Sequence, residues 1–146
     1  MSDSTVNMFG DFEPEFTHPD SASVTIFPVP YDGTSTWVKG ADKGPQAILS
    51  ASEHLEYYDI ETDSEVFRKG IFTESPIGIA DDPQKMTQLV LQRVNDAFKR
   101  GKFPVVLGGE HSVSIGAIQA AAQVFENLTV LQLDAHTCLL YTSDAA

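Results

Sequence analysis

The sequence predicts an α/β protein with three layers, α/β/α, built around a mainly parallel sheet. Three short apolar runs, rich in β-branched residues, show little alternation of apolar and polar positions, as strands buried on both faces do. Stretches with helical periodicity separate these runs, and the joints between them are short. Strand, helix and strand in that order are typical of the parallel crossover unit. The chain of 146 residues suits a single domain.

The N-terminal part is predicted to form an arm, a strand and a loop. Residues 1–22 are expected to be a mobile arm with three aromatic residues that offer an anchor on a neighbouring surface: Phe9, Phe12 and Phe16. Residues 23–29 are predicted to be the first strand. The polar loop 31–36 follows at the carboxyl end of that strand, where functional residues gather.

The next stretch is predicted to hold one helix and then irregular structure. Pro45 suits the first turn of a helix that is expected to end near residues 57–58. Residues 59–82 are expected to be irregular, with short strands around 70–73 and 77–79.

The clearest helix of the chain is expected to begin after Asp82, its capping residue, with Pro83 in the first turn. One apolar face recurs at helical spacing: Met86, Leu89, Val90, Val94 and Ala97. Gly101 is expected to end this helix, and residues 103–107 to form the next strand.

A third helix is predicted to run from Ser112, its cap, to about Phe125. Four of its residues are expected to face inward: Ile115, Ile118, Ala122 and Phe125. Residues 128–133 are the last predicted strand.

The charge balance restricts the classes of partner. Acidic residues outnumber basic residues by 21 to 9, for a formal net charge of −12. This argues against a nucleic-acid partner, because phosphate contact needs clustered Lys and Arg. It suits a small cationic substrate, although an acidic surface that only maintains solubility is the simpler interpretation.

Neither a membrane nor a secreted location is indicated. No apolar run approaches the roughly 18 residues needed to span a bilayer, and the N-terminus lacks the features of a secretory signal. With a single cysteine, Cys138, the protein is expected in the reducing cytoplasm.

The first chemical motif, Gly108-Gly109-Glu110-His111-Ser112, directly follows the strand at 103–107. The glycines allow a positive φ and a close approach of the backbone, and Glu110 and His111 are expected to project over the sheet edge. Taken alone, the motif is better explained by a plain turn between a strand and a helix, with His111 at the surface or in a cap.

The second motif, Asp134-Ala135-His136, follows the strand at 128–133 and places two ligand-type side chains at positions i and i+2. Taken alone, it is equally consistent with an Asp that caps a turn. Together the motifs lie at the same end of two strands that one crossover helix connects. Imidazole and carboxylate suit Mn²⁺ or Zn²⁺, so His111, Asp134 and His136 are the candidate metal ligands.

These motifs resemble those of the ureohydrolases, the arginase and agmatinase family, which carries a Gly-Gly-x-His-Ser run and an Asp-Ala-His-x-Asp run. The stretches Val29-Pro30-Tyr31-Asp32-Gly33-Thr34-Ser35 and Gly44-Pro45-Gln46-Ala47-Ile48 also resemble the family, and its agmatinase branch more than arginase. The resemblance covers residues 24–137 and implies the N-terminal half of an arginase-like α/β domain, here 23–137.

The resemblance implies a site with two Mn²⁺ ions bridged by a hydroxide. His111 would bind one ion, His136 the other, and Asp134 would bridge both. The hydroxide would attack the guanidinium carbon of a small cationic substrate and release urea. For agmatine the second product is putrescine, a polyamine. The resemblance further implies a homo-oligomer for the intact protein.

The chain departs from the family at Cys138, where the family has Asp. A later Ser-x-Asp-x-Asp-x-x-Asp-Pro run is also absent, and residues 138–146 do not continue the family pattern. We interpret this tail as an artefact of sequence joined to a truncated gene, and we expect the intact gene to encode Asp at position 138. The chain by itself is expected to be inactive.

Three alternatives stay open at this point. The resemblance favours agmatine as the substrate; hydrolysis of another guanidino compound, guanidinobutyrate or arginine, is one alternative, and a non-catalytic relative with little metal is another. A nucleotide-binding domain is the weakest alternative, since no Gly-x-Gly-x-x-Gly run follows the first strand.

Overall fold

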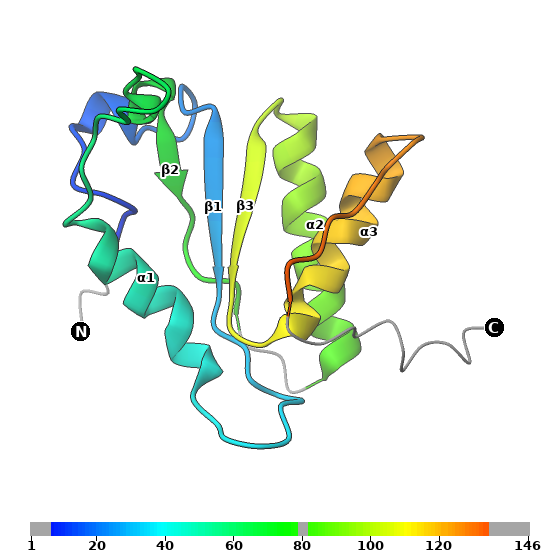
Figure 1. The fold of residues 1–146 in the computed structure, drawn as a ribbon. Helices are drawn as coiled ribbons and strands as arrows, with labels where there is room; N and C mark the ends of the chain where they lie inside the picture. The colour runs from blue at the N-terminus through cyan, green and yellow to red at the C-terminus, as the bar shows by residue number, and fades with distance from the viewer. Residues whose placement is uncertain (1–6, 79–81, 135–146) are drawn as a thin grey trace, which may run out of the picture.

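The computed structural model describes residues 7–78 and 82–134 (Figure 1). Three parallel strands form one sheet in the order β2-β1-β3: β1 is Val24–Val29, β2 is Ile71–Thr73 and β3 is Phe103–Gly108. β1 pairs with β3 along its whole length, from Val24 opposite Phe103 to Val29 opposite Gly108. The predicted α/β class with a parallel sheet is confirmed.

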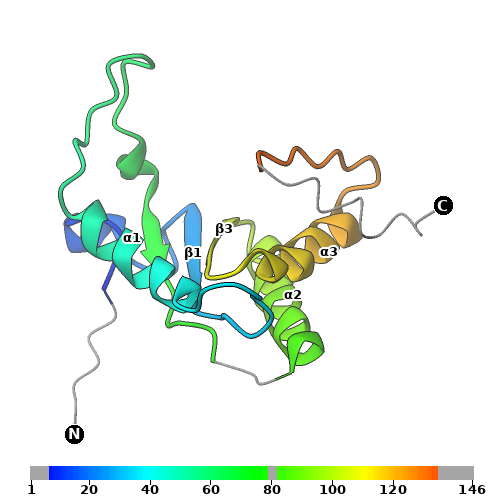
Figure 2. The same cartoon turned by 60° about the horizontal axis from the view of Figure 1, so that its bottom comes forward.

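Helices cover both faces of the sheet. They are α1 (Gly44–Ser52), α2 (Pro83–Lys99) and α3 (Ser114–Val124). The described chain also has four 3₁₀ turns: η1 (Pro14–Phe16), η2 (Ala41–Lys43), η3 (Val66–Lys69) and η4 (His111–Val113). α2 and α3 pack side by side against β1 and β3, and α1 lies across the sheet from them (Figures 1 and 2).

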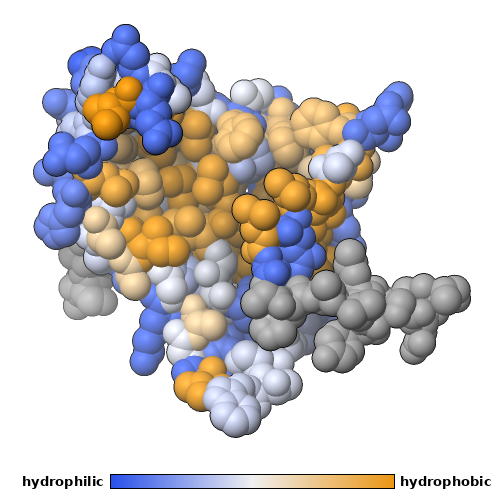
Figure 3. Space-filling model, in the orientation of Figure 1, coloured by the Kyte–Doolittle hydropathy of each residue, from blue (hydrophilic) through white to orange (hydrophobic). Residues whose placement is uncertain are grey.

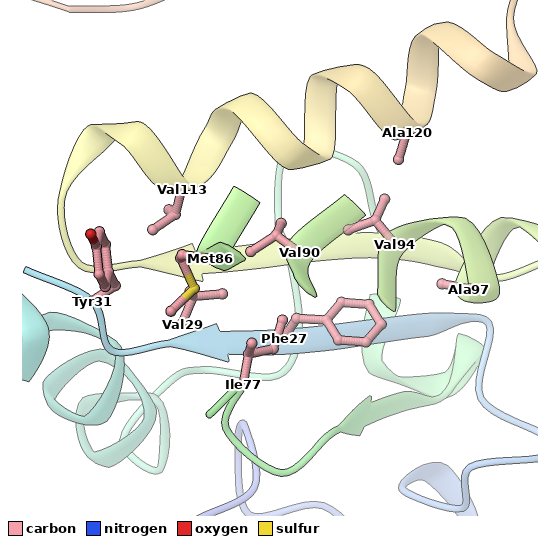
Figure 4. Packing of buried hydrophobic residues seen from close by; sticks show 10 residues of the cluster. All are labelled: Phe27, Val29, Tyr31, Ile77, Met86, Val90, Val94, Ala97, Val113 and Ala120. Carbon is pink, nitrogen blue, oxygen red and sulfur yellow. The ribbon is translucent and has the colours of Figure 1, made fainter. Parts of the chain in front are cut away.

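The main core lies between β1 and the pair α2–α3 (Figure 4). Every residue of β1 after Val24 is buried, as expected for a central strand covered on both faces. Figure 4 shows Phe27 and Val29 of β1 pointing toward Met86 and Val90 of α2. This packing holds the carboxyl ends of β1 and β3 at one edge of the sheet.

α2 forms as its local signals predict. The Asp82 carboxylate accepts a hydrogen bond of 2.8 Å from the Gln84 N–H, and Pro83 occupies the first turn. The buried residues come from the predicted face: Met86, Val90, Val94 and Ala97. Gly101 has a φ of +69°, the left-handed conformation that glycine adopts where helices end. β3 follows at once, also as predicted.

α3 forms over the predicted range, but the predicted inward face is wrong. Ile115, Ile118 and Phe125 are 46%, 39% and 51% exposed and Ala122 is exposed as well, whereas Gly116 and Ala120 are buried. The reason is a close helix contact, because a Cβ on Gly116 would lie 2.4 Å from the Thr87 carbonyl oxygen of α2. The small residues therefore face the core. Ser112 does not cap α3, whose first turn follows Val113.

α1 ends at Ser52, several residues before the predicted end. The Ser52 hydroxyl donates to the Leu49 carbonyl at 2.6 Å and accepts the Gly10 N–H at 2.8 Å. The last turn of α1 is therefore tied to the N-terminal segment instead of continuing as a helix.

Residues 7–22 pack on their own chain and are not a loose arm where the structure describes them. The rings of Phe12 and Phe67 stack with centroids 5.0 Å apart, and Phe16 meets Phe67 edge-on at 5.1 Å. Tyr57 joins the same group at 5.2 Å from Phe67. The predicted aromatic anchor therefore exists, and the neighbouring surface is η3 of the same chain.

The predicted strand at 128–133 is wrong, because these residues pair with no strand of the described sheet. The segment crosses in front of α2 and α3 in Figure 1. Residues 128–131 line an apolar hollow of about 540 Å³ together with residues of α2, β3 and α3. Leu131 and Leu133 are 82% and 90% exposed. If residues 128–133 formed a strand buried on both faces, other segments would pack on these two side chains, and no described segment does so. Ile77, in the predicted strand 77–79, also lies outside any strand.

Within residues 7–78 and 82–134, none of the helices is both long and apolar enough to cross a bilayer.

Candidate functional site

The two predicted motifs meet at the carboxyl edge of the sheet, as far as the structure describes them. His111 opens η4 immediately beyond β3, and its Nδ1 lies 2.8 Å from a carboxylate oxygen of Asp134. The His111 side chain is 53% exposed and that of Asp134 is 17% exposed. Two candidate ligands separated by 22 residues of chain therefore face one another at the position where open α/β sheets bind ligands.

Gly109 allows the backbone before His111 to run against the end of β1. The Gly109 N–H donates to the Val29 carbonyl at 3.0 Å, and the Glu110 N–H donates to the Tyr31 carbonyl at 2.9 Å. A Cβ on Gly109 would lie 2.2 Å from that Tyr31 oxygen. The predicted close approach is confirmed, whereas the predicted positive φ is wrong: the described glycines with positive φ are Gly10, Gly40, Gly70 and Gly101.

Glu110 does not project over the sheet edge as expected; its side chain turns inward and the residue is 9% exposed. The carboxylate accepts the backbone N–H groups of Thr34 at 2.6 Å and Ser35 at 3.0 Å, and the hydroxyls of Thr34 and Ser112. Burial raises the pKa of Glu110, but the hydrogen bonds from Ser112 and Thr34 outweigh it, so the pKa lies below its ordinary value.

A second carboxylate, that of Asp32, organises the loop between β1 and α1 from within. It accepts the Ser35 hydroxyl and the N–H groups of Gly40 at 2.7 Å and Ala41 at 3.2 Å, and Lys39 Nζ lies 3.4 Å away. These bonds, first that from Ser35, lower the pKa of Asp32 to about 2. We call residues 32–41 the β1–α1 loop.

The β1–α1 loop leaves its tip in solvent. Trp37 is 93% exposed and Val38 is 70% exposed, so Trp37 is not the packing residue that an aromatic side chain usually is. The loop runs beneath the carboxyl ends of β1 and β3, beside the start of α3 (Figure 2). It forms one side of the sheet edge that carries His111.

An open hollow of about 380 Å³ lies directly beside His111. Its lining comes from the end of β3 and the turn into α3: Val106, Gly108, Gly109, Glu110, His111, Val113 and Ser114. The hollow is large enough for a small ligand next to the candidate metal ligands.

The donor chemistry of His111 and Asp134 fits a divalent metal. An imidazole nitrogen and a carboxylate oxygen 2.8 Å apart are close to the roughly 3 Å that separates neighbouring donors of one ion with bonds of about 2.1 Å. Within residues 7–78 and 82–134, no three His, Cys, Asp or Glu side chains group as a metal site. The third candidate, His136, and Cys138 lie outside the described residues.

Asp32 and Glu110 are the residues whose roles the sequence did not reveal. Asp32 lies in a polar loop at a strand end, which is the signal that could have singled it out. Glu110 gave no such signal, since its partners Thr34 and Ser35 are 76 and 75 residues away in the chain.

Comparisons with known proteins agree with one another. Residues 22–144 match the arginase family. N(1)-aminopropylagmatine ureohydrolase of Synechocystis sp. is 36% identical over 122 residues, which are 79% of this chain and 40% of that protein. The crystal structure of agmatine ureohydrolase of Thermoplasma volcanium superposes with a TM-score of 0.71 at 25% identity, over 80% of this chain and 39% of that one.

Arginase from Bacillus subtilis has the same fold over this region, with a TM-score of 0.66 and 32% identity, covering 80% of this chain and 39% of that one. The chain therefore spans about two fifths of the length of the curated relatives it matches.

Proposed function

The chain belongs to the arginase family of ureohydrolases, and from this membership we propose that the protein carrying it hydrolyses a guanidino group with the help of Mn²⁺. The observation that carries the proposal is the meeting of His111 and Asp134 at 2.8 Å on the carboxyl edge of the sheet. An imidazole and a carboxylate are ligands of the kind that Mn²⁺ accepts. His136, two residues beyond Asp134, is proposed as a further ligand.

The chain's own residues would hold and shape the site. His111 and Asp134 would bind the metal, which when bound supplies a Lewis acid that lowers the pKa of water and provides a nucleophile near neutral pH. Gly109 keeps the backbone of the His111 turn against Tyr31, and the β1–α1 loop encloses one side. Hydrolysis then adds water to the guanidino carbon of the substrate, breaks the bond from that carbon to the nitrogen that carries the alkyl group, and releases urea and an amine.

We propose agmatine as the substrate, with putrescine and urea as products. Two relatives support this choice, because their names refer to agmatine and to its aminopropyl derivative. Agmatine is also a dication, which suits a chain with a formal net charge of −12. We further propose a homo-oligomer in the cytoplasm, with no nucleic-acid or membrane partner.

The test measures urea release by the protein in its full length. Agmatine, N(1)-aminopropylagmatine, guanidinobutyrate and arginine are compared with and without Mn²⁺. We expect agmatine to give the highest kcat/KM, and removal of Mn²⁺ by a chelator to abolish turnover reversibly. Because changes to residues that only orient metal ligands cost about 10–100-fold, His111→Ala is expected to lower kcat/KM more than about 100-fold.

His54→Ala is the matched control, because His54 is exposed on the chain beyond α1 and away from the site. It is expected to leave kcat/KM unchanged. Turnover by His111→Ala at the unmodified rate would contradict the proposed site, and a higher rate with another substrate would correct the proposed specificity. Absence of both urea release and Mn²⁺ binding would favour the non-catalytic relative.

A further inference from the structure

We propose that Glu110 is a positioning residue: it clamps the β1–α1 loop to the carboxyl end of β3 and thereby holds His111 in place. The clamp is an inference from geometry alone. Its consequence for metal binding rests on the proposed function, because only there is His111 a ligand.

The first argument is the burial of a charge. Glu110 is the only carboxylate, and the only charged side chain, among the buried residues that the structure describes. A buried carboxylate is costly unless hydrogen bonds replace its water. Four donors surround this one: two N–H groups, from Thr34 and Ser35, and two hydroxyls, from Thr34 and Ser112. One carboxylate oxygen accepts the two N–H groups and the other accepts the two hydroxyls, so every one of the four bonds is to the ionised group.

The second argument is connectivity. Thr34 and Ser35 belong to the loop after β1, whereas Glu110 and Ser112 belong to the turn after β3. The carboxylate therefore joins the ends of the two neighbouring strands through side-chain bonds, in addition to the backbone bond from Glu110 N–H to Tyr31. Ser112 binds it from the other side of His111, so both neighbours of His111 take part.

The third argument is that the clamped loop behaves as one body. Asp32 closes the loop on itself through the Ser35 hydroxyl and the Gly40 and Ala41 N–H groups. Ser35 thus contacts both carboxylates, Asp32 by its hydroxyl and Glu110 by its N–H. A change at Glu110 should therefore reach Trp37, the only tryptophan of the chain, which stands 93% exposed at the loop tip.

The experiment compares the unmodified 146-residue chain with Glu110→Gln, Thr34→Val and Glu53→Gln. Glutamine keeps the shape of Glu110 but removes its charge, and its NH₂ group takes the place of the oxygen that accepts the Thr34 and Ser112 hydroxyls, so these two hydroxyls lose their acceptor. Thr34→Val removes one hydroxyl donor from an exposed loop position that does not touch the core. Glu53→Gln is the matched control, since it removes the same charge at an exposed position at the end of α1.

Three quantities are measured: the fluorescence anisotropy of Trp37, the heteronuclear NOE of the His111 amide, and Mn²⁺ affinity from the EPR signal of free Mn²⁺. In Glu110→Gln we expect anisotropy and NOE both to fall, and Mn²⁺ affinity to drop at least about tenfold, as for other groups that orient a ligand. Thr34→Val should shift all three in the same direction and by less. Glu53→Gln should shift none.

The outcomes separate the clamp from the proposed function. A Glu110→Gln chain with unchanged His111 NOE and unchanged Mn²⁺ affinity would overturn the proposal, even if Trp37 became more mobile, because Glu110 would then only tie the loop. If the unmodified chain binds no Mn²⁺, the proposed metal site fails, and the anisotropy and NOE still decide the clamp. Thr34→Val guards against a global folding defect in Glu110→Gln, which thermal unfolding would reveal.

Discussion

Two carboxylates, Asp32 and Glu110, stabilise the same loop from opposite sides. Asp32 binds groups within the β1–α1 loop, and Glu110 binds that loop to the turn beyond β3. Each has a lowered pKa, because hydrogen bonds to the ionised form outweigh the cost of removing the carboxylate from water. The chain has 12 excess negative charges, and these two carboxylates hold a loop in place instead of only contributing to an acidic surface.

The pKa of Asp32 makes the loop sensitive to acid in a defined direction. Because the folded-state pKa is about 2 and the ordinary value is 3.8, the unfolded chain binds the proton more readily. The contribution of Asp32 to stability is therefore complete above the ordinary value and is lost as the pH falls toward 2. Asp32→Asn should remove this part of the pH dependence.

The measurement is the free energy of unfolding by urea between pH 2 and pH 6, for the unmodified chain and for Asp32→Asn. The two curves should lie apart and parallel above about pH 5 and converge as the pH falls through the range from 3.8 to about 2. A separation that grows toward low pH would show that Asp32 is not held by these bonds.

At the scale of elements, the contact between α2 and α3 depends on the absence of a side chain. Gly116 brings the two helix backbones together, since a Cβ there would lie 2.4 Å from the Thr87 carbonyl oxygen and 2.9 Å from the Cβ of Val90. The Thr87 oxygen belongs to a helix backbone and cannot rotate away, so a methyl group at residue 116 must push the helices apart.

We expect Gly116→Ala to destabilise the chain, although alanine favours a helix over glycine by about 1 kcal/mol. Overpacking in a close contact costs about 1–3 kcal/mol, and a rigid neighbour places the cost at the upper end, so the steric effect exceeds the propensity gain. Urea unfolding measures the difference. Gly78→Ala is the control, because nothing lies within 4 Å of a Cβ at Gly78. Equal stability of both variants would contradict the close contact.

The elements that the sequence predicted correctly are those with local signals. Asp82 and Pro83 define the start of α2, and Gly101 its end, whatever the rest of the chain does. The inward face of α3 depends instead on a partner helix. Hydrophobic periodicity selects the apolar Ile115 and Ile118 as the buried face and not Gly116, yet the space beside α2 admits only a small residue.

The candidate site follows the same division. The sequence predicts that His111 and Asp134 meet, because strand ends share one edge of a parallel sheet; they do meet, but residues 128–133 reach that edge without forming a strand. The inward turn of Glu110 was not predictable, because it depends on donors 75 and 76 residues away. The prediction of a strand at 128–133 failed for a related reason. A strand buried on both faces needs other segments packed on Leu131 and Leu133, and no described segment packs there.

At the scale of the whole molecule, the described chain presents an open sheet edge together with an apolar surface. β3 has a strand partner on one side only, and residues 128–133 pair with no strand of the described sheet. Figure 3 shows apolar side chains gathered over the sheet and over the segment beside α3. Open edges and exposed β-branched segments are templates for pairing with another chain.

The 146-residue chain is therefore expected to self-associate as its concentration rises, through β3 and residues 128–133. Leu131→Lys should weaken this association, because it replaces a side chain that is 82% exposed with a charge at the position where chains would pair. Gln132→Lys adds the same charge at an exposed polar neighbour and is the matched control.

Sedimentation velocity over a range of concentrations measures the association of all three chains. The expected order is strong association for the unmodified chain and Gln132→Lys, and weaker association for Leu131→Lys. A monomeric unmodified chain at high concentration would mean that the packing of 128–131 over β3 and α3 already protects the edge, and equal weakening by both lysines would assign the association to charge instead of apolar contact.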